Sequence, residues 1–237
     1  MSAYEIKRSG TQERSCRPVN TLDTLDVEIP PVGLGGILQV PARARSLVAF
    51  VHGSGSSRFS PRNRTVAKAL NGNGIATLLF DLLKPDEESD RRNVFNVSLL
   101  ADRVVETIRW LDREDELAGL PLGLFGASTG AAAAIIAAAK CPDRVRAVVS
   151  RGGRPDLAGP ALDIARAPTL LLVGGADVEV LELNRQALTR LQGPKALEVI
   201  AGASHLFPEP GALEAVVQYA AAWFLRYLVP SAADAAF

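Results

Sequence analysis

The stretch GLFGASTGAAAA, residues 123–134, places Ser128 two residues after Gly126 and two residues before Gly130. An apolar run precedes it and a run of alanines follows it. This G-x-S-x-G pattern is typical of a sharp strand-to-helix turn that holds a serine up for chemistry. The alternative is a helix start built of small residues with an incidental hydroxyl, and the rest of the chain has to separate the two.

The turn would need its glycines for steric reasons. Side chains two residues either side of the serine would collide with the neighbouring helix and strand, and the serine itself would take a strained backbone angle. The alanine run would let the helix pack close to a sheet while its N-terminus favours developing negative charge near Ser128.

Short apolar runs without alternation recur along the chain, as expected for strands buried on both faces of a parallel sheet. They are SLVAFVH (46–52), IATLLFDLL (75–83), LPLGLFG (120–126), VRAVVS (145–150), PTLLLVGG (168–175) and ALEVIAG (196–202). Amphipathic segments lie between several of them and after the last, near residues 100–111 and 213–227, and Ser60-Pro61 predicts a helix start. We therefore predict an α/β fold, a doubly wound, mostly parallel sheet with helices on both faces.

The polar N-terminal segment and the overall charge indicate the domain organisation and argue against some classes of binding protein. Residues 1–25 are polar and predict an N-terminal extension, residues 26–230 predict a single domain, and segments 25–29 and 35–40 predict an antiparallel edge hairpin. The 26 lysines and arginines equal the 26 aspartates and glutamates, which argues against general binding to nucleic acid or a membrane surface. We expect no signal peptide or spanning helix, and a cytoplasmic location.

Cysteine and histidine usage predicts no metal site. Cys16 and Cys141 have no ligand spacing and no disulfide framework, and suit a reducing compartment. The chain has two histidines, His52 and His205, isolated from one another. Two such histidines without clustered carboxylates do not form a metal centre.

A serine nucleophile needs a base, and the base needs an orienting carboxylate. His205 follows an apolar strand and Asp177 follows the strand before it. Active sites of open α/β sheets lie at the carboxyl ends of the strands, so we predict that Ser128, Asp177 and His205 form a catalytic triad. Glu179 and Glu182 are the alternative carboxylates, and an aspartate capping the next helix is the alternative for Asp177.

The oxyanion hole requires two backbone N–H groups. One would come from Thr129, the residue after the nucleophile, and the other from the glycine-rich loop after the strand at 46–52, where Ser54 is the candidate. His52 opens that loop, and we expect it to brace the loop by hydrogen bonding and to lie among the substrate-binding residues rather than act as a base.

The chain resembles the dienelactone hydrolase-like branch of the α/β-hydrolase superfamily, and particularly the hydrolase module that also occurs fused to phosphoribosyltransferase domains. The segments that carry the resemblance are FVHGSGSSRFSPRNRTVA (50–67), GLFGASTGAAAAI (123–135), AVVSRGGRPDLAG (147–159) and PTLLLVGGAD (168–177). The resemblance implies the α/β-hydrolase fold with little or no cap domain, hydrolase activity, and no cofactor. Dienelactone hydrolases use a cysteine nucleophile where this chain has Ser128, which leaves hydrolysis expected but not the dienelactone substrate. No phosphoribosyltransferase part is present, so we expect no nucleotide chemistry.

Two loops at strand ends carry arginines: Arg58, Arg62 and Arg64, and Arg151 and Arg154. One hypothesis is that Arg151, together with Arg58, binds a carboxylate on the substrate. The alternative is that all five are solvated or pair with nearby acidic residues.

The residues thus predict a serine hydrolase that cleaves a carboxylic ester, lactone or thioester of a small-molecule substrate, neutral or anionic. An acyltransferase on the same triad and a non-catalytic binding protein on the hydrolase scaffold remain as alternatives, and a homodimer stays open.

Overall fold

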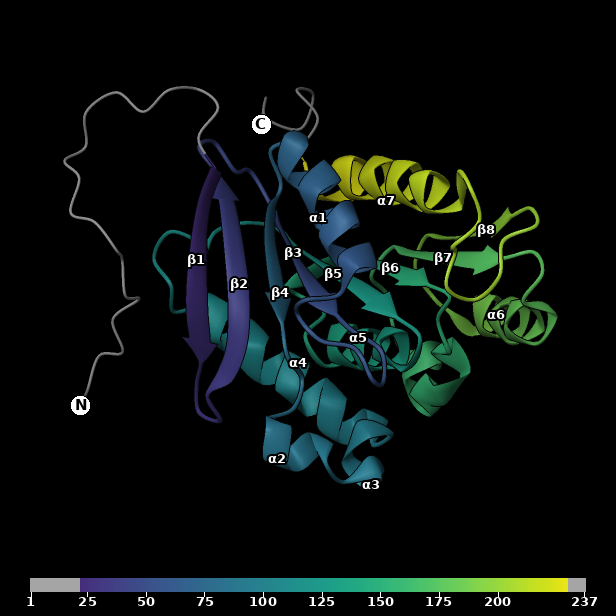
Figure 1. The fold of residues 1–237 in the computed structure, drawn as a ribbon, viewed down its shortest axis with the longest axis horizontal. Helices are drawn as coiled ribbons and strands as arrows, with labels where there is room; N and C mark the ends of the chain where they lie inside the picture. The colour runs from purple at the N-terminus through teal and green to yellow at the C-terminus, as the bar shows by residue number, and fades with distance from the viewer. Residues whose placement is uncertain (1–21, 230–237) are drawn as a thin grey trace.

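An eight-stranded sheet forms the centre of the molecule (Figure 1). The computed structural model describes residues 22–229. Its strands are β1 (Leu22–Ile29), β2 (Leu34–Pro41), β3 (Leu47–Val51), β4 (Ala76–Phe80), β5 (Leu122–Ala127), β6 (Val145–Arg151), β7 (Thr169–Gly174) and β8 (Lys195–Ile200). They lie in the order β1-β2-β4-β3-β5-β6-β7-β8, and all pairs from β4 onward are parallel. The doubly wound, mostly parallel sheet predicted from the sequence is confirmed.

β1 and β2 form the predicted antiparallel hairpin at one edge of the sheet, with Leu25 opposite Leu38. β1 begins at Leu22, three residues earlier than the predicted strand and inside the segment predicted as an extension. The difference arises because most of β1 is exposed at the sheet edge, so its first residues carry no apolar signature. Residues 1–21 and 230–237, which include Cys16 and most of the predicted extension, lie outside the described residues.

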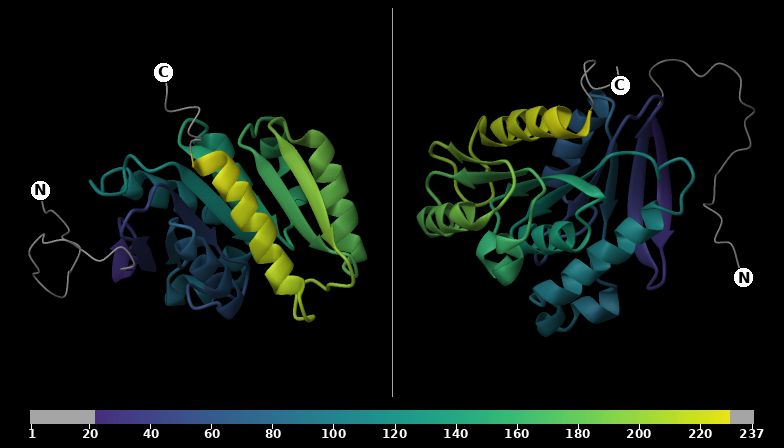
Figure 2. Two further views of the ribbon diagram at one scale, coloured as in Figure 1. Left: turned by 90° about the horizontal axis from the view of Figure 1, so that it is seen from above. Right: turned by 180° about the vertical axis from the view of Figure 1, so that it is seen from behind.

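Helices cover both faces of the sheet (Figures 1 and 2). α1 (Pro61–Gly72) and α7 (Ala212–Leu228) pack on one face through residues such as Val66 and Phe224. α4 (Val97–Leu111), α5 (Thr129–Lys140) and α6 (Val178–Arg190) lie on the other. Ser60 caps α1 as predicted, since its side chain accepts a hydrogen bond from the Asn63 N–H.

The central strands explain the apolar runs in the sequence. Every residue of β3, β4, β5 and β7 is buried, because helices cover both faces. Such strands have no solvent face and hence no alternation of polar and apolar residues. β8 lies at the other edge of the sheet and is mostly exposed or half-buried.

Two short insertions stand at the carboxyl edge of the sheet, and neither forms a cap domain. α2 (Pro85–Glu88) and α3 (Arg91–Val94), one turn each, lie between β4 and α4, and the 3₁₀ segment η1 (Pro155–Asp163) joins β6 to β7. Within residues 22–229, no helix combines the length and the apolar character needed to cross a membrane.

Candidate active site

Ser128 occupies a strained turn between β5 and α5. Its φ is 50° and its ψ is −125°, a combination that L-residues rarely adopt. The turn is tied to the next strand, because the Ser128 N–H donates to the carbonyl of Arg151 over 3.3 Å. Ser128 remains partly exposed. The turn therefore lifts the hydroxyl above the sheet, as the sequence pattern predicts.

The two flanking glycines are required by close backbone contacts. A Cβ on Gly126 would lie 2.5 Å from the Ala131 Cα in α5. A Cβ on Gly130 would lie 2.2 Å from the carbonyl oxygen of Val51 at the end of β3. A side chain at either position would therefore collide with the neighbouring helix or strand, as expected from the sequence pattern.

His205 and Asp177 are joined by a hydrogen bond. His205 Nδ1 lies 2.7 Å from Asp177 Oδ2. Asp177 stands at the N-cap position of α6, yet its side chain makes no capping bond, so the capping alternative is wrong. Glu179 and Glu182 are exposed, and Glu182 Oε2 lies 3.6 Å from Arg185 Nη1. Of the three carboxylates considered, Asp177 is the one that contacts the imidazole.

The His205 loop lies close to the serine turn. A Cβ on Gly152 would come within 2.8 Å of the His205 carbonyl oxygen and 3.7 Å of its Cε1, and Gly152 directly follows Arg151, whose carbonyl binds Ser128. The loop is closed by the Glu209 carboxylate, which accepts the Ser204 N–H over 3.0 Å. That bond holds the pKa of Glu209 below its usual value. Within residues 22–229, no hydrogen bond joins the Ser128 hydroxyl to the His205 ring.

The loop after β3 lies directly over Ser128. A Cβ on Gly53 would be 2.8 Å from the Ser128 Cβ, so only a glycine lets the loop approach this closely. The next residue, Ser54, donates its backbone N–H to Thr129 Oγ1 over 3.1 Å. Thr129 is 7% exposed. The two residues predicted to form the oxyanion hole are thus in contact, but the Ser54 N–H is directed at the threonine hydroxyl.

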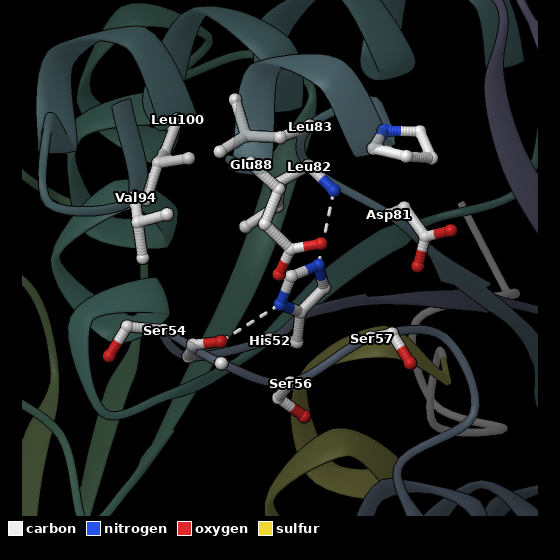
Figure 3. A pocket seen from close by; sticks show the side chains of 13 residues that line it. His52, Ser54, Ser56, Ser57, Asp81, Leu82, Leu83, Glu88, Val94 and Leu100 are labelled. Atoms are coloured by element: carbon white, nitrogen blue, oxygen red, sulfur yellow. Dashed lines mark hydrogen bonds between the residues drawn. The ribbon is translucent and has the colours of Figure 1, made fainter. Parts of the chain in front are cut away.

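His52 connects this loop to the end of β4 (Figure 3). Its Nδ1 lies 2.9 Å from the Gly53 carbonyl oxygen, and its Nε2 accepts the Leu82 N–H over 3.1 Å. One ring nitrogen must be protonated and the other bare, so the ring is neutral. Burial lowers the pKa of His52, although Asp81 and Glu88 act in the opposite direction. Both ring nitrogens are therefore used in hydrogen bonds, one within the loop and one to the segment after β4, as expected for a bracing residue, and neither remains for a substrate.

Arg58 is paired with a carboxylate of the protein. Its backbone N–H donates to Asp81 Oδ1 over 2.8 Å, and its guanidinium donates to Asp81 Oδ2. The guanidinium also packs on the Phe59 ring, 4.4 Å from its centroid. The charge of Arg58, which the sequence suggested as a substrate contact, is thus already neutralised by Asp81. Arg154 similarly pairs with Asp156 over 2.8 Å.

Arg151 is buried without an acidic partner among the described residues, with 6% of its surface exposed. Its Nη2 lies 3.5 Å from Asn63 Oδ1, its guanidinium carbon lies 6.0 Å from the centroid of the Phe207 ring, and its Nε has no partner. Burial, reinforced by the positive charge of Arg62, lowers the pKa of Arg151 to about 10. Arg62 also has a buried Nε without a partner. Arg151 and Arg62 therefore lie together near the serine turn, and neither has an acidic partner among residues 22–229.

A small cavity adjoins the loop over Ser128 (Figure 3). It holds about 70 Å³, several times the ~10–15 Å³ that one water requires. Neither Ser128 nor His205 lines it; the walls come from the β3 loop and from the segment after β4. The lining residues are His52, Gly53, Ser54, Gly55, Ser56, Ser57, Asp81, Leu82, Leu83, Pro85, Glu88, Val94 and Leu100.

The segment after β4 was not predicted as part of the site, although the position of Asp81 in the sequence indicated it. Asp81 directly follows an apolar run, which is the position that singled out Asp177 and His205. The strand-end rule applied to β4 would have found it. No group of three or more histidine, cysteine or acidic side chains arranged to hold a metal ion occurs within residues 22–229.

A strand-to-helix serine turn at the carboxyl edge of a doubly wound sheet, followed by an aspartate and a histidine after later strands, defines the class of α/β hydrolases. Solved structures agree. The fold matches Est1E from Butyrivibrio proteoclasticus with a TM-score of 0.72 at 16% identity, covering 86% of this chain and 98% of that one. It matches the esterase domain of a Rhodothermus marinus protein with a TM-score of 0.68 at 21% identity, covering 88% and 100%.

Nearer relatives define the family. A dienelactone hydrolase from Anabaena variabilis is 50% identical, with a TM-score of 0.85 over 89% of this chain and 100% of that chain. The chain therefore belongs to the dienelactone hydrolase family of the α/β hydrolases.

Curated sequences extend the comparison to longer proteins. Putative phosphoribosyl transferases of Mycobacterium tuberculosis, strains CDC 1551 and H37Rv, are each 51% identical over 224 residues, which cover 94% of this chain. The chain spans about half the length of these curated relatives, 51% in each case. No protein-family model matches the chain.

Proposed function

We propose that this α/β hydrolase is a serine-dependent carboxylic ester hydrolase that cleaves an ester, lactone or thioester through an acyl-enzyme on Ser128. The observation that carries the proposal is the 2.7 Å hydrogen bond between His205 Nδ1 and Asp177 Oδ2 beside the strained serine turn. With the Nδ1 proton held by Asp177, the lone pair of Nε2 is free to accept a proton.

In the proposed reaction, Ser128 Oγ attacks the substrate carbonyl carbon while His205 Nε2 takes the hydroxyl proton. The tetrahedral intermediate collapses, and His205 returns the proton to the departing alcohol or thiol. Water then attacks the acyl-enzyme by the same route and releases the acid. Hydrogen bonds between nucleophile and base are often long in unliganded enzymes and tighten when substrate binds, which accommodates the separation of Ser128 from His205.

Hydrolysis is favoured over the two alternatives by specific observations. The His205 side chain is 38% exposed, so water reaches the base, whereas an acyltransferase must keep water from the acyl-enzyme. A backbone angle such as that of Ser128 costs of order 1–3 kcal/mol, and a protein that only bound its ligand would gain nothing from it.

We propose that the substrate carries a carboxylate that Arg151 binds. Burying a guanidinium without a counter-charge is costly, and Arg151 lies with Arg62 near the serine turn without an acidic partner among residues 22–229. Arg58 takes no part in this proposal because Asp81 already binds it. An anionic substrate group would supply the missing charge by a two-pronged hydrogen bond.

The substrate charge is tested with a neutral ester and its carboxylate-bearing analogue. Arg151→Met keeps the side-chain volume and removes the charge, and Arg154→Met is the matched control because Arg154 is paired with Asp156. We expect Arg151→Met to lower kcat/KM about 30- to 1,000-fold for the anionic ester only. Equal losses on both esters would mean that Arg151 supports the structure of the site rather than the substrate.

The reaction class is tested with p-nitrophenyl esters of increasing chain length. The wild type should show a burst of p-nitrophenol equal to the enzyme concentration when deacylation is slower than acylation, and Ser128→Ala should show neither burst nor turnover. Short acyl chains should react fastest if the small cavity receives the acyl group. Turnover by Ser128→Ala at more than a few per cent of the wild-type rate would exclude the proposed nucleophile.

A further inference from the structure

The hydroxyl of Thr129 lies between the loop after β3 and the start of α5. It accepts the Ser54 N–H over 3.1 Å, and within residues 22–229 it donates to no acceptor. We propose that this hydroxyl donates a hydrogen bond to the oxyanion formed on the substrate, so that the Thr129 N–H and the Thr129 O–H together form the oxyanion hole. The proposal rests on Ser128 being the nucleophile.

The position of Thr129 suits this role. It is the first residue of α5 and directly follows Ser128. The N–H groups of the first helical turn have no partners inside the helix, so the Thr129 N–H is available to an anion beside Ser128. The hydroxyl belongs to the same residue, and its partner Ser54 follows Gly53, which packs on the Ser128 Cβ. Both donors therefore belong to the residue that directly follows the proposed nucleophile.

The bond from Ser54 determines which way the hydroxyl can act. Because one lone pair of Oγ1 receives the Ser54 N–H, the hydroxyl proton must point elsewhere. Accepting one hydrogen bond also polarises the hydroxyl and makes it a stronger donor. In this arrangement Ser54 supports the oxyanion hole through Thr129 and need not contact the substrate itself.

The Ser128 Oγ forms a bond to the carbonyl carbon, its proton moves to His205 Nε2, and the π electron pair of the carbonyl moves onto oxygen. That oxygen accepts hydrogen bonds from the Thr129 N–H and O–H. When the intermediate collapses, the pair returns to re-form the carbonyl, the bond from the carbonyl carbon to the leaving group breaks with its electron pair on the leaving group, and the leaving group takes the proton from His205. Hydrogen bonds from a hydroxyl to an anionic oxygen are short and strong, so the interaction is greatest when the charge is present.

Thr129→Val tests the proposal, since valine keeps the branched shape and removes only the hydroxyl. Loss of one oxyanion donor typically costs about 10²–10³-fold in kcat, so we expect kcat for a p-nitrophenyl ester to fall about 100-fold with little change in KM. Affinity for an aryl trifluoromethyl ketone, which adds Ser128 to form a tetrahedral oxyanion, should fall by a similar factor. Thr129→Ser, which restores the hydroxyl, should recover most of both losses.

A direct contact between the Ser54 N–H and the oxyanion would predict a different effect of Thr129→Val on kcat. If the Ser54 N–H contacts the oxyanion directly, the threonine hydroxyl competes with the substrate, and Thr129→Val should leave kcat unchanged or raise it. That result, with the wild-type unfolding temperature retained, would overturn the proposal.

Thr107→Val is the matched control. The Thr107 hydroxyl is buried in α4 and donates to the Arg103 carbonyl over 2.9 Å, and its loss should leave kcat unchanged. If Ser128 were not the nucleophile, Ser128→Ala would keep its activity, which distinguishes failure of the proposed function from failure of the Thr129 proposal. A low kcat in Thr129→Val without weaker ketone binding would also overturn the proposal, since the hydroxyl would then act at another step.

Discussion

His205 Nδ1 and Asp177 Oδ2 lie 2.7 Å apart, although the two residues are separated by 28 positions in the chain. The contact exists because β7 and β8 are parallel neighbours, so that the loops after their carboxyl ends meet at one edge of the sheet. The same edge carries the serine turn after β5. A hydrogen bond between loops that follow separate strands indicates a site assembled by the fold rather than by local sequence.

Replacing Asp177 by asparagine should lower kcat by up to about 10⁴-fold, because the amide can no longer hold the histidine in the tautomer with a bare Nε2. The loss should be smaller than that in His205→Ala, as for the orienting carboxylate of related triads. Steady-state hydrolysis of a p-nitrophenyl ester measures both. Glu179→Gln and Glu182→Gln are the controls and should retain wild-type rates; full activity in Asp177→Asn would transfer the role to one of those two residues.

Ser128→Gly should be more stable than Ser128→Ala, although both lack the proposed nucleophile. The backbone angle of 50° at this position is unstrained only for glycine, and relief of such strain is worth about 1 kcal/mol or more. Urea denaturation of the two variants, which differ in one methyl group, measures the difference directly. A less stable glycine variant would show that the turn is not strained in solution.

Gly126→Ala and Gly130→Ala should each lower the free energy of unfolding by more than about 3 kcal/mol or prevent folding. The added Cβ would lie 2.5 Å and 2.2 Å, respectively, from backbone atoms that cannot move aside. Gly72, in α1, has open space around it, so Gly72→Ala should be neutral or stabilise by about 0.5–1 kcal/mol. Thermal unfolding of the three variants compares them, and similar losses in all three would refute the steric explanation.

Stability should fall in mild acid through His52. Burial holds the pKa of His52 below its ordinary value of 6.5, so the unfolded chain binds a proton more readily than the folded one. The contribution is therefore complete above about pH 6.5 and decreases as the pH drops, by at most about 1.4 kcal/mol per pH unit. Urea denaturation at pH 7.5 and pH 5.5 measures the slope. His52→Gln, which can still accept the Leu82 N–H, should reduce that slope, and an unchanged slope would assign it to other groups.

Much of the fold, and the contact between Asp177 and His205, could be predicted because each rested on a local rule. The buried strands have apolar runs, Gly126 and Gly130 frame Ser128, and Asp177 and His205 follow strands. Contacts between loops that are distant in the chain could not be predicted from the sequence. The pairing of Arg58 with Asp81 depends on β3 and β4 being neighbours, and the approach of Arg62 to Arg151 brings together segments almost ninety residues apart.

The direction of the Ser54 N–H could not be predicted from the sequence either, because a backbone donor can point toward a side chain or toward a substrate. Its partner, Thr129 Oγ1, is identified only by the three-dimensional arrangement.

The role of Ser128 as the nucleophile is tested most directly by covalent labelling. A fluorophosphonate reacts with a serine only where a base activates the hydroxyl, because phosphonylation requires the hydroxyl proton to leave. Brief treatment of the wild type, followed by digestion and tandem mass spectrometry, should place one phosphonyl group on Ser128, and His205→Ala should remain unlabelled. A label on Ser54, Ser56 or Ser57, or no label on an enzyme that hydrolyses esters, would contradict the proposed mechanism.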